Sequence, residues 1–407
     1  MRICIITPSQ LGSNPRVVKE ANALCGAGHA VTVVCTRVAA FVEPRDQAVI
    51  SAAQFLVRRL PFDRPNAWRI ARLRQMAARA LCRIGLARTC ADAALNAMVP
   101  GLARAARAIA ADLYIAHYPA ALPAAARAAH RNGARYAFDA EDFHLGDLPD
   151  LPEHSFEKGL IKHVEGRYLP SAAFITAASP MIADAYAETY GVLPPATVLN
   201  VFPRTNAPAR STASGAHRPS PTLYWFSQVI GPERGLETAL RALPLTRAPL
   251  HLHLRGTLAI GYEQTLRDLA AALGVANRLH LHAPIAPDAL ERDAVRFDLG
   301  YAGDLAETVN RGIALTNKLF SYLTSGLPIL ASDIPAHREL APQLGQAAEL
   351  FVSGDPTSLA AAIDRCLASR EALAARRRQA WDLGQSQFAW ELEADKVIQL
   401  VQSCQQD

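Results

Sequence analysis

Residues 2–36 read RICIITPSQLGSNPRVVKEANALCGAGHAVTVVCT, and this stretch predicts the fold class. An apolar strand, RICIITP, leads through a turn into a helix with Asn14 as its N-cap. Pro15 suits the first helical position, where its missing N–H costs no hydrogen bond. Gly26 and Gly28 end the helix, and HAVTVVCT predicts a second strand. Strand, helix and strand in this order form a right-handed parallel βαβ unit.

The same alternation of apolar strands and Ala-rich helices continues along the chain. Further strands are predicted at 113–118, 135–140, 173–179 and 197–202, and then at 222–229, 250–256, 278–283, 297–303 and 328–334. Between the two series, APARSTASGAHRPSP at 207–221 has three prolines and small polar residues, which is typical of a linker. The chain of 407 residues also fits two domains of ~200 residues better than one core. We therefore predict an α/β protein with two doubly wound, Rossmann-like domains, at 1–206 and 222–385.

The composition excludes several classes of protein. Half of the residues are hydrophobic and 19% are charged, so the chain can bury a large interior and is not disordered. No apolar stretch reaches the ~18 to 20 residues of a membrane span, and the N-terminus is predicted to be a strand and not a signal peptide. The seven cysteines are odd in number and none form a C-x-x-C pair. We expect a reduced, cytoplasmic protein without structural zinc.

The loop after the first strand bears on the ligand. Ligands of open α/β sheets bind beyond the carboxyl ends of the strands, and two such domains facing each other would form a cleft there. This loop has only Gly12 where a dinucleotide site needs G-x-G-x-x-G, which disfavours a nicotinamide or flavin enzyme. The helix N-terminus at 14–16 could bind an anion, or Gly12 could serve only the turn.

Two basic residues of the second series are candidate phosphate ligands. Arg234 lies in YWFSQVIGPERGLE at 224–237, just before a predicted helix. The apolar pattern of this helix does not explain an arginine at that position. Its planar fork suits a phosphate, although a solvated surface arginine is the plain alternative. Lys318, in NKLFSYLTSGLPILASD at 317–333, lies near the start of a short helix. Both residues follow strand ends of one domain, so together they could neutralise a diphosphate.

At these residues the chain resembles a known family. NKLFSYLTSGLPILASD is similar to the K-L-F-E-Y-M-A-x-G-x-P-V-V-A-S signature of family 4-like glycosyltransferases of the GT-B fold. NPRVVKEANALCGAGHAVTVV resembles their first helix and second strand, and WFSQVIGPERGLE resembles their donor-phosphate loop. The final segment, 386–407, resembles the closing helix that crosses back to the first domain. The resemblance spans nearly the whole chain and implies a GT-B fold with an enzyme that uses a nucleotide diphosphate sugar and no metal or other cofactor.

The resemblance also implies roles for individual residues. It places Gly12, Gln228, Arg234 and Lys318 at the donor diphosphate, and His117 beside the transferred sugar. It places Arg16, Asp142 and His144, the last two in DAEDFH, near the acceptor. It places Asn310, Asn317 and Ser321 at the donor ribose and sugar.

The sequence departs from the family pattern at three positions. Gln228 replaces a phosphate-binding arginine, Ser321 replaces the glutamate that holds the ribose, and Ala314 replaces the glutamate seven residues upstream. We expect Glu307, as a second catalytic residue with His117, and Asn310 to take over contacts with the sugar.

Simpler interpretations of the polar residues remain open. His117 and His144 could be buried structural histidines, and the acidic residues of 139–142 could cap a loop. Asp147 and Asp150 could suggest a metal site, but the leucines and prolines around them favour a turn. The histidines of HLHLRG and RLHLHA could bind a metal, but strand alternation explains their spacing more simply.

An arginine-rich segment, 58–107, indicates an anionic partner. It holds eleven arginines against Asp63 and Asp92, a net charge of +9, so the rest of the chain sums to −4. On a helical projection Arg69, Arg72, Arg79 and Arg83 share one sector, and an apolar sector with Ile70, Leu73, Ala77, Leu81 and Ile84 adjoins it. Peripheral contact with an anionic membrane is one interpretation. A solvated helix with its apolar side on the core is the other, and nucleic acid is disfavoured because aromatic residues are not interleaved.

The function that we predict is transfer of a sugar from a nucleotide diphosphate sugar to a saccharide or lipid-linked acceptor in envelope or exopolysaccharide synthesis. Family resemblance implies retention of the anomeric configuration. We expect the protein to act in the cytoplasm or at the inner face of the plasma membrane. One alternative is a non-hydrolysing nucleotide-sugar epimerase, which has the same fold and needs no acceptor. Another is a non-catalytic GT-B-like binding protein, because both family glutamates are missing.

Overall fold

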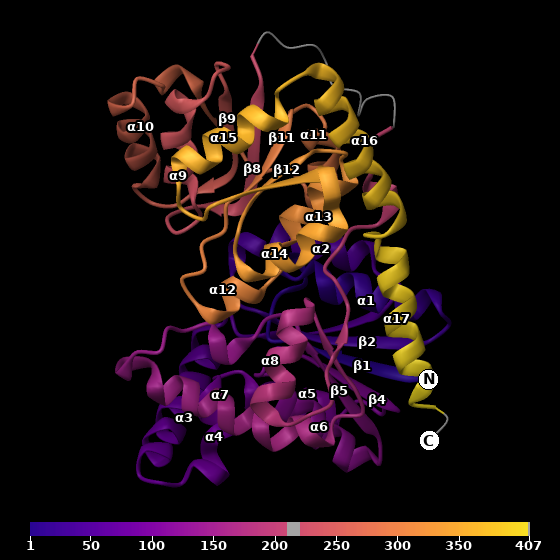
Figure 1. Cartoon of the computed structure of the whole chain (residues 1–407). Coiled ribbons are helices and arrows are strands. Elements are labelled where there is room, and N and C mark those ends of the chain that lie inside the picture. The colour runs from indigo at the N-terminus through magenta and orange to yellow at the C-terminus, as the bar shows by residue number, and fades with distance from the viewer. Residues whose placement is uncertain (210–219, 406–407) are drawn as a thin grey trace. The chain divides into compact units, whose positions relative to one another are not determined.

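The computed structural model describes residues 1–209 and 220–405. Most of the linker predicted at 207–221 therefore lies outside the described residues. The chain divides into two units, the first formed by Met1–Val198, Thr308–Asn310 and the chain from Ala394 onward, and the second by Leu199–Glu307 and Arg311–Glu393. Figure 1 shows a parallel sheet with helices packed around it in each unit. The predicted α/β class with two doubly wound domains is confirmed.

The first unit is built on a seven-stranded parallel sheet in the order β3-β2-β1-β4-β5-β6-β7. Its strands are β1 (Arg2–Ile6), β2 (Ala30–Arg37), β3 (Leu56–Pro61), β4 (Leu113–His117), β5 (Arg135–Ala140), β6 (Ile175–Ala177) and β7 (Ala196–Thr197). Its helices are α1 (Pro15–Gly26), α2 (Glu43–Ala52), α3 (Pro65–Arg83), α4 (Ala87–Leu95), α5 (Val99–Arg107), α6 (Leu122–Asn132), α7 (Ser155–Tyr168) and α8 (Pro180–Tyr190). The order reverses at β1 and β4, so ligands are expected beyond their carboxyl ends.

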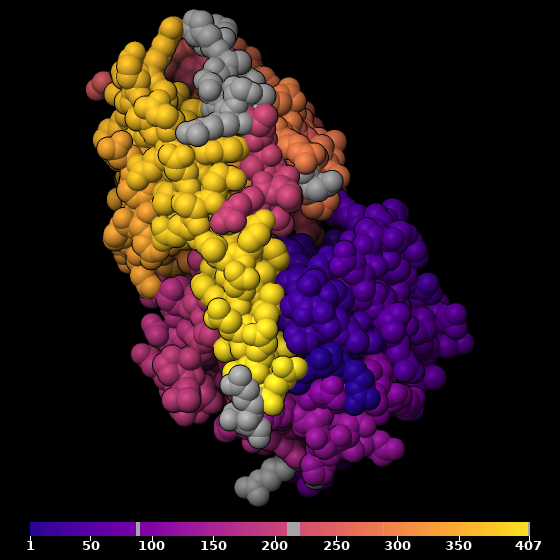
Figure 2. Space-filling view, turned by 90° about the vertical axis from the view of Figure 1, so that its right-hand side faces the viewer, coloured from indigo at the N-terminus to yellow at the C-terminus, as the bar shows by residue number. Residues whose placement is uncertain are grey.

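The second unit has a six-stranded parallel sheet in the order β10-β9-β8-β11-β12-β13. Its strands are β8 (Thr222–Ile230), β9 (His251–Leu258), β10 (Leu279–His282), β11 (Leu299–Ala302), β12 (Ile329–Ser332) and β13 (Ala348–Phe351). The helices from here to the end are α9 (Leu236–Ala242), α10 (Tyr262–Ala272), α11 (Leu290–Ala294), α12 (Val309–Ile313), α13 (Asn317–Thr324), α14 (Pro335–Leu344), α15 (Pro356–Cys366), α16 (Arg370–Ser386) and α17 (Trp390–Ser403). In Figure 2 the yellow end of α17 lies against the indigo N-terminal part of the first unit, and Lys396 Nζ donates to the Thr197 carbonyl at 3.3 Å.

The predicted start of the chain is confirmed in detail. Asn14 is the N-cap of α1, with its Oδ1 accepting the Val17 N–H at 3.2 Å, and Pro15 occupies the first turn. Strands β1 and β2 pair in parallel from Arg2 opposite Ala30 onward. Val17, Ala21 and Leu24 are buried, which accounts for the apolar stripe of the helix.

The predicted strands differ from the observed ones in three places. Strand β3 was not predicted because its sequence, LVRRLP, contains two adjacent arginines, and β13 (AELF) was missed as well. Both are edge strands, where polar side chains are common because one side of the strand has no partner. The strand expected at 197–202 shrinks to the two residues of β7 and an isolated bridge from Phe202 to Ala389.

Helix α3 packs by its small side chains and exposes its large ones. The residues buried in it are Ala71, Gln75, Ala78 and Cys82, next to α4, and Gln75 Nε2 donates to the Ala94 carbonyl at 3.2 Å. The large apolar residues along it and just after it are exposed, namely Trp68, Ile70, Leu73, Met76, Leu81, Ile84 and Leu86. The structure therefore contradicts one of the two interpretations of this segment, the one in which its apolar sector packs on the core.

All seven cysteines are free thiols, and Cys4, Cys35, Cys82 and Cys366 are buried. Among residues 1–209 and 220–405, no helix has the length and apolar character of a membrane span.

Candidate functional site

A buried charged cluster lies at the carboxyl ends of β4 and β5 in the first unit. His117, the last residue of β4, is fully buried, and both of its ring nitrogens have carboxylate partners. Nε2 lies 2.6 Å from Glu20 Oε2, and Nδ1 lies 3.0 Å from Glu141 Oε1. Glu20 comes from α1 and Glu141 directly follows β5. The switch point of the sheet thus holds a histidine between two acids.

The charges of this cluster fix its protonation. Burial alone would lower the pKa of His117, but Glu20, Asp139 and the hydrogen bonds to Glu141 and Glu20 raise it to about 10. Burial would raise the pKa of Glu141, but the hydrogen bond and charge of His117, with help from Arg16, lower it to about 2. At neutral pH the pair is therefore an imidazolium and a carboxylate. A protonated His117 cannot act as a general base, and its role in the cluster is to hold the Glu141 carboxylate in place.

Glu141 is the partly open member of the cluster, with 12% of its side chain exposed. Its Oε1 also accepts from Asn14 Nδ2 at 2.9 Å, and its Oε2 accepts from the Tyr118 hydroxyl at 3.3 Å. Tyr118 has a φ of +68°, a conformation that costs about 1–3 kcal/mol for a residue with a side chain. This backbone conformation lies directly after β4, next to the contact of the Tyr118 hydroxyl with Glu141, and no residue pattern indicated it.

Arg16 occupies the remaining side of the cluster. Its Nε lies 2.9 Å and 3.1 Å from the two Asp139 carboxylate oxygens, and its Nη1 donates to the Val198 carbonyl at 2.8 Å. Glu20, His117 and Asp139 offer three atoms close enough together for one metal ion. Because Asp139 is already paired with Arg16 and His117 with two carboxylates, the residues present form an ion-pair network that does not fit a metal ion. Arg16, predicted at the acceptor, is buried in this network.

A second polar group in the first unit surrounds His144. Its Nδ1 lies 3.1 Å from Asp147 Oδ2, and its Nε2 is buried without a hydrogen-bond partner. Burial would lower the pKa of His144, but Asp147, Glu165 and Asp142 raise it. Burial raises the pKa of Asp142. The unsatisfied Nε2 marks His144 as a group that can still take a partner.

Asn310, predicted at the donor sugar, is bound to the same group. Its Oδ1 accepts the Phe143 N–H at 2.8 Å, and its Nδ2 donates to Asp142 at 3.0 Å and to Asp147 at 2.7 Å. Thr308–Asn310 accordingly belong to the first unit. All hydrogen-bonding atoms of the Asn310 amide are thus engaged with the predicted acceptor stretch.

Gly12 has a structural task in the turn after β1. Its N–H donates to Asp46 Oδ1 at 2.6 Å, and a Cβ atom there would lie 2.8 Å from the Arg45 Cβ. The glycine therefore lets α2 approach closely, and its N–H is occupied by a carboxylate of the protein. This favours the turn interpretation of Gly12.

In the second unit Lys318, one of the two predicted phosphate ligands, lies beside the carboxylate of Asp304, which follows β11, whereas Arg234 is exposed. Lys318 Nζ, on α13, lies 3.8 Å from Asp304 Oδ1 and 5.8 Å from the ring centre of Trp225. Burial would raise the pKa of Asp304, but Lys318, His337, the Thr316 hydroxyl and Arg234 hold it below its usual value. Asp304 and His337 are members of this cluster that the sequence did not indicate.

His337 completes the second cluster from α14. Its Nδ1 hydrogen bonds with the Ser332 carbonyl at 2.8 Å, and its Nε2 lies 4.0 Å from Asp304 Oδ2 without a hydrogen bond. Burial lowers the pKa of His337, so the ring is neutral at pH 7. A lysine and a neutral histidine thus lie beside Asp304, whose side chain is 16% exposed.

The loop that carries Arg234 is tightly shaped. Gly235 has a φ of +68°, and a Cβ atom there would lie 2.1 Å from the Gly303 carbonyl oxygen. Glu233 also has a positive φ, +60°, and Arg311 Nη1 donates to its carbonyl at 3.2 Å. Arg311 Nη1 also lies 2.9 Å from Glu307 Oε2, so Glu307 is paired and partly exposed at this loop. The glycine brings the start of α9 onto the end of β11, where Asp304 follows.

Ser321 is buried, and its hydroxyl donates to Glu291 Oε1 at 2.7 Å. Glu291, on α11, is fully buried and also accepts from Asn206 Nδ2 at 3.2 Å. A carboxylate is therefore present beside the position of the missing family glutamate, but it comes from another helix. Asn317 and Gln228 are both exposed, at the start of α13 and at a bulge near the end of β8.

Two family models match the chain. Residues 12–205 match the model described as glycosyl transferase 4-like domain, and residues 220–369 match the model described as glycosyl transferases group 1. No curated protein matches the chain.

Solved structures confirm the predicted GT-B fold. HepE of Anabaena, in complex with UDP, is 16% identical, with 99% of this chain and 100% of that chain covered and a TM-score of 0.72. Sucrose-phosphate synthase of Thermosynechococcus elongatus is 13% identical, with 99% and 98% covered and a TM-score of 0.74. A glycosyltransferase of Rickettsia africae is 12% identical, with 100% and 99% covered and a TM-score of 0.70.

Proposed function

This chain belongs to the family of group 1 glycosyltransferases with a 4-like first domain, and from that premise we propose that it transfers a sugar from a nucleotide diphosphate sugar. Membership of a transferase family speaks against both the epimerase and the non-catalytic alternatives. The observation that carries the proposal is the buried Lys318 ammonium beside Asp304, in the segment that follows β11.

The second unit is the proposed donor domain. Departure of the nucleotide diphosphate places negative charge on the β-phosphate, and fixed cations lower the barrier to that step. Lys318 is 7% exposed and is held by Asp304, so its charge is positioned before the donor arrives. In this proposal Lys318 and Arg234 supply the positive charge that a metal ion supplies in other enzymes, and Asn317, Gln228 and Glu307 contact the donor.

The first unit is the proposed acceptor domain. His117 acts through Glu141, whose ionised carboxylate can accept a hydrogen bond from a sugar hydroxyl. His144 and Asp142 orient the acceptor, with the free Nε2 of His144 as the hydrogen-bonding atom. Because His117 is an imidazolium at neutral pH and cannot take the acceptor proton, we propose that the leaving phosphate takes it, which goes with retention of configuration.

The nucleotide base of the donor is the first property to determine. We expect one nucleoside diphosphate among UDP, GDP, ADP and CDP to stabilise the protein by ~2.7 kcal/mol at a hundred times its dissociation constant. HepE was crystallised with UDP and with UDP-glucose, which makes UDP the first ligand to try. Thermal unfolding with each nucleotide makes the comparison. If no nucleotide shifts the transition, the protein does not bind a donor of this class and the proposal is wrong.

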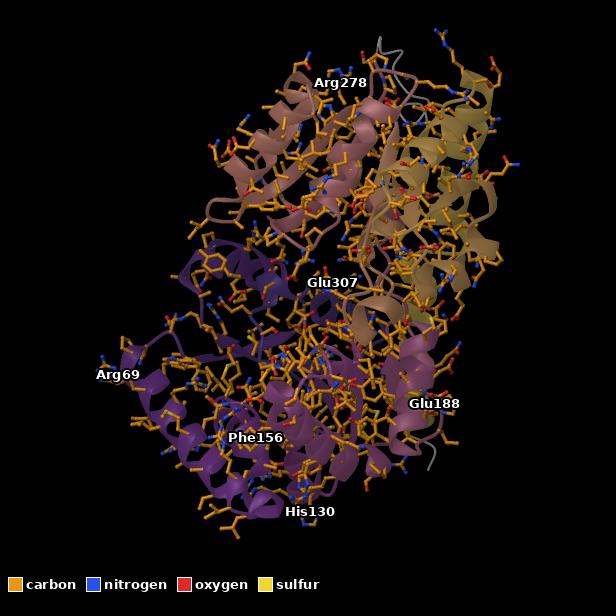
Figure 3. The ribbon with its side chains drawn as sticks, turned by 60° about the vertical axis from the view of Figure 1, so that its left-hand side comes forward. Arg69, His130, Phe156, Glu188, Arg278 and Glu307 are labelled. Carbon is orange, nitrogen blue, oxygen red and sulfur yellow. The ribbon has the colours of Figure 1, made fainter. Side chains whose placement is uncertain are left out.

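We further propose an acceptor of envelope or exopolysaccharide synthesis, used at the inner face of the plasma membrane, with α3 as the contact to anionic lipid. Between Asp63 and Asp92 the chain has no acidic residue and seven arginines. Arg79 and Arg83 stack on the Phe156 ring at 4.8 and 4.6 Å, which anchors the helix to α7. Arg69 extends away from the start of α3 in Figure 3, and Leu73 and Ile84 are 65% and 74% exposed. An outward face that is both apolar and cationic fits an anionic bilayer.

The double variant Leu73→Asn, Ile84→Asn should lose most binding to vesicles that contain phosphatidylglycerol. Each buried leucine or isoleucine is worth ~1.5–3 kcal/mol, so the affinity should fall at least about tenfold. Cosedimentation with phosphatidylglycerol vesicles and with phosphatidylcholine vesicles makes the measurement. Leu193→Asn is the matched control, because Leu193 is 88% exposed and lies outside α3. Equal binding of all three proteins, or binding to neutral vesicles alone, would contradict the lipid contact.

A further inference from the structure

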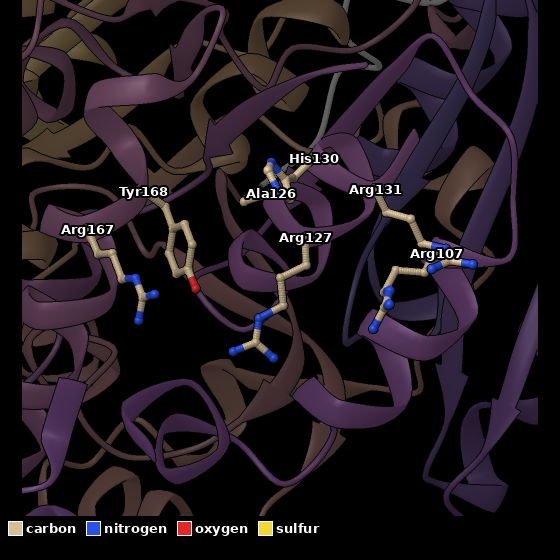
Figure 4. Close-up of a pocket in the computed structure, with 7 residues that line it drawn as sticks. All are labelled: Arg107, Ala126, Arg127, His130, Arg131, Arg167 and Tyr168. Atoms are coloured by element: carbon tan, nitrogen blue, oxygen red, sulfur yellow. The ribbon is translucent and has the colours of Figure 1, made fainter. Parts of the chain in front are cut away.

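The first unit has a basic pocket at the edge of its sheet opposite His117. Helices α5, α6 and α7 end just before strands β4, β5 and β6, so the last turns of these helices lie at the amino ends of the strands. A cavity of about 350 Å³ lies there, lined by Arg107, Ala126, Arg127, His130, Arg131, Arg167 and Tyr168 (Figure 4). No residue of the proposed donor or acceptor clusters lines it.

The charges around this pocket do not balance. Arg127 pairs with Asp92 of α4, whose Oδ2 also accepts from the Tyr168 hydroxyl at 2.7 Å. Arg167 lies over the Tyr168 ring at 5.3 Å. Arg107 and Arg131 are exposed and form no ion pair within residues 1–209 and 220–405. Two guanidinium groups of the lining, those of Arg107 and Arg131, therefore have no carboxylate partner among the described residues.

The helix dipoles account for only part of this arrangement. Arg107, Arg131 and Arg167 lie in the last turns of their helices, where a cation is favoured by ~0.3–1 kcal/mol. Arg127, in contrast, is in the middle of α6, and the dipoles do not require three helices to direct their arginines to one cavity. Like charges that converge on one cavity repel each other unless an anion lies between them.

We propose that this pocket binds the phosphate group of a phosphate ester. The fork of a guanidinium group matches two phosphate oxygens, and Arg107 and Arg131 from neighbouring helices can hold one phosphate from two directions. The Tyr168 ring and Ala126 form an apolar wall for the organic part of the ester. The ester is either a soluble molecule or the headgroup of a phospholipid, and both present the same chemistry to the pocket. The proposal does not depend on glycosyl transfer.

Calorimetric titration of the whole protein with glycerol 3-phosphate tests the pocket. We expect binding that Arg131→Gln and Arg107→Gln each weaken about tenfold, because each removes a charged hydrogen bond to the phosphate. Arg104→Gln is the matched control, since it removes an exposed arginine of α5 outside the pocket and should change the affinity less than twofold. UDP binding should be the same in all variants, which separates this site from the proposed donor site.

Vesicles distinguish the two sources of the phosphate. If Arg131→Gln reduces binding to phosphatidylglycerol vesicles more than Arg104→Gln does, the ligand is a lipid headgroup; if both reduce it equally, the pocket serves a soluble ester. Absence of glycerol 3-phosphate binding together with equal vesicle binding by both variants would overturn the proposal. The proposal would also be overturned if Arg104→Gln and Arg131→Gln weakened the binding of glycerol 3-phosphate equally, because that would indicate an unspecific effect of charge.

Discussion

Replacement of Lys318 by alanine should lower kcat/KM at least about a hundredfold. In other enzymes, removal of one fixed donor that stabilises the charge of the transition state costs ~10²–10³ in kcat, or ~2.7–4 kcal/mol. The Lys318 ammonium is buried, 3.8 Å from Asp304 Oδ1 and 5.8 Å from the centre of the Trp225 ring, and the alanine variant leaves this position without a charge. Turnover of the donor that the thermal measurement identifies, with and without acceptor, gives the value.

Two further variants separate charge from packing at this position. Lys318→Arg keeps the positive charge and should retain more activity than Lys318→Ala. Lys162→Ala removes an exposed lysine of α7 and should leave kcat/KM unchanged. Unchanged turnover and donor affinity in Lys318→Ala, with the protein folded, would show that the diphosphate is bound elsewhere.

The sequence could predict the group of residues around Asp304 in part, because the topology of a parallel sheet brings the segments after its strands to one edge. Lys318 approaches Asp304 at 3.8 Å, and Arg234, which follows β8, contributes to the lowered pKa of Asp304. Asp304 itself follows β11 in FDLGYAGD, so the same rule could have found it. His337 comes from a helix that starts beyond β12, and its approach to Asp304 depends on tertiary packing.

The partners of His117 could not be predicted in the same way. Glu20 lies 97 positions from His117 in the chain and in the middle of α1, where a charged residue ordinarily faces water. Its contact depends on how α1 is rotated against β4. Helix α3 shows the same limit, since periodicity tells which residues share a face but not which face packs. Its small residues, Ala71 and Ala78, permit close contact with α4, and the large ones remain outside.

The variant Arg16→Met should destabilise the protein by ~3–5 kcal/mol, because it leaves the carboxylate of Asp139 buried without its partner. Arg16 is 1% exposed and makes hydrogen bonds to both Asp139 oxygens and to the Val198 carbonyl. The double variant Arg16→Met, Asp139→Asn removes the uncompensated charge and should be more stable than the single variant. Chemical denaturation of the three proteins gives the free energies of unfolding.

The pH dependence of this loss identifies its cause. Burial already raises the pKa of Asp139 against the opposing charge of Arg16, and loss of Arg16 raises that pKa further. When the folded-state pKa of a carboxyl group exceeds its unfolded value, the folded state binds more protons between the two values, so stability increases as the pH falls through that window. The deficit of Arg16→Met should therefore shrink on acidification, whereas that of the double variant should not. If Arg16→Met instead unfolds like the unaltered protein and only weakens acceptor binding, Arg16 acts directly on the acceptor and the buried ion pair is not its main role.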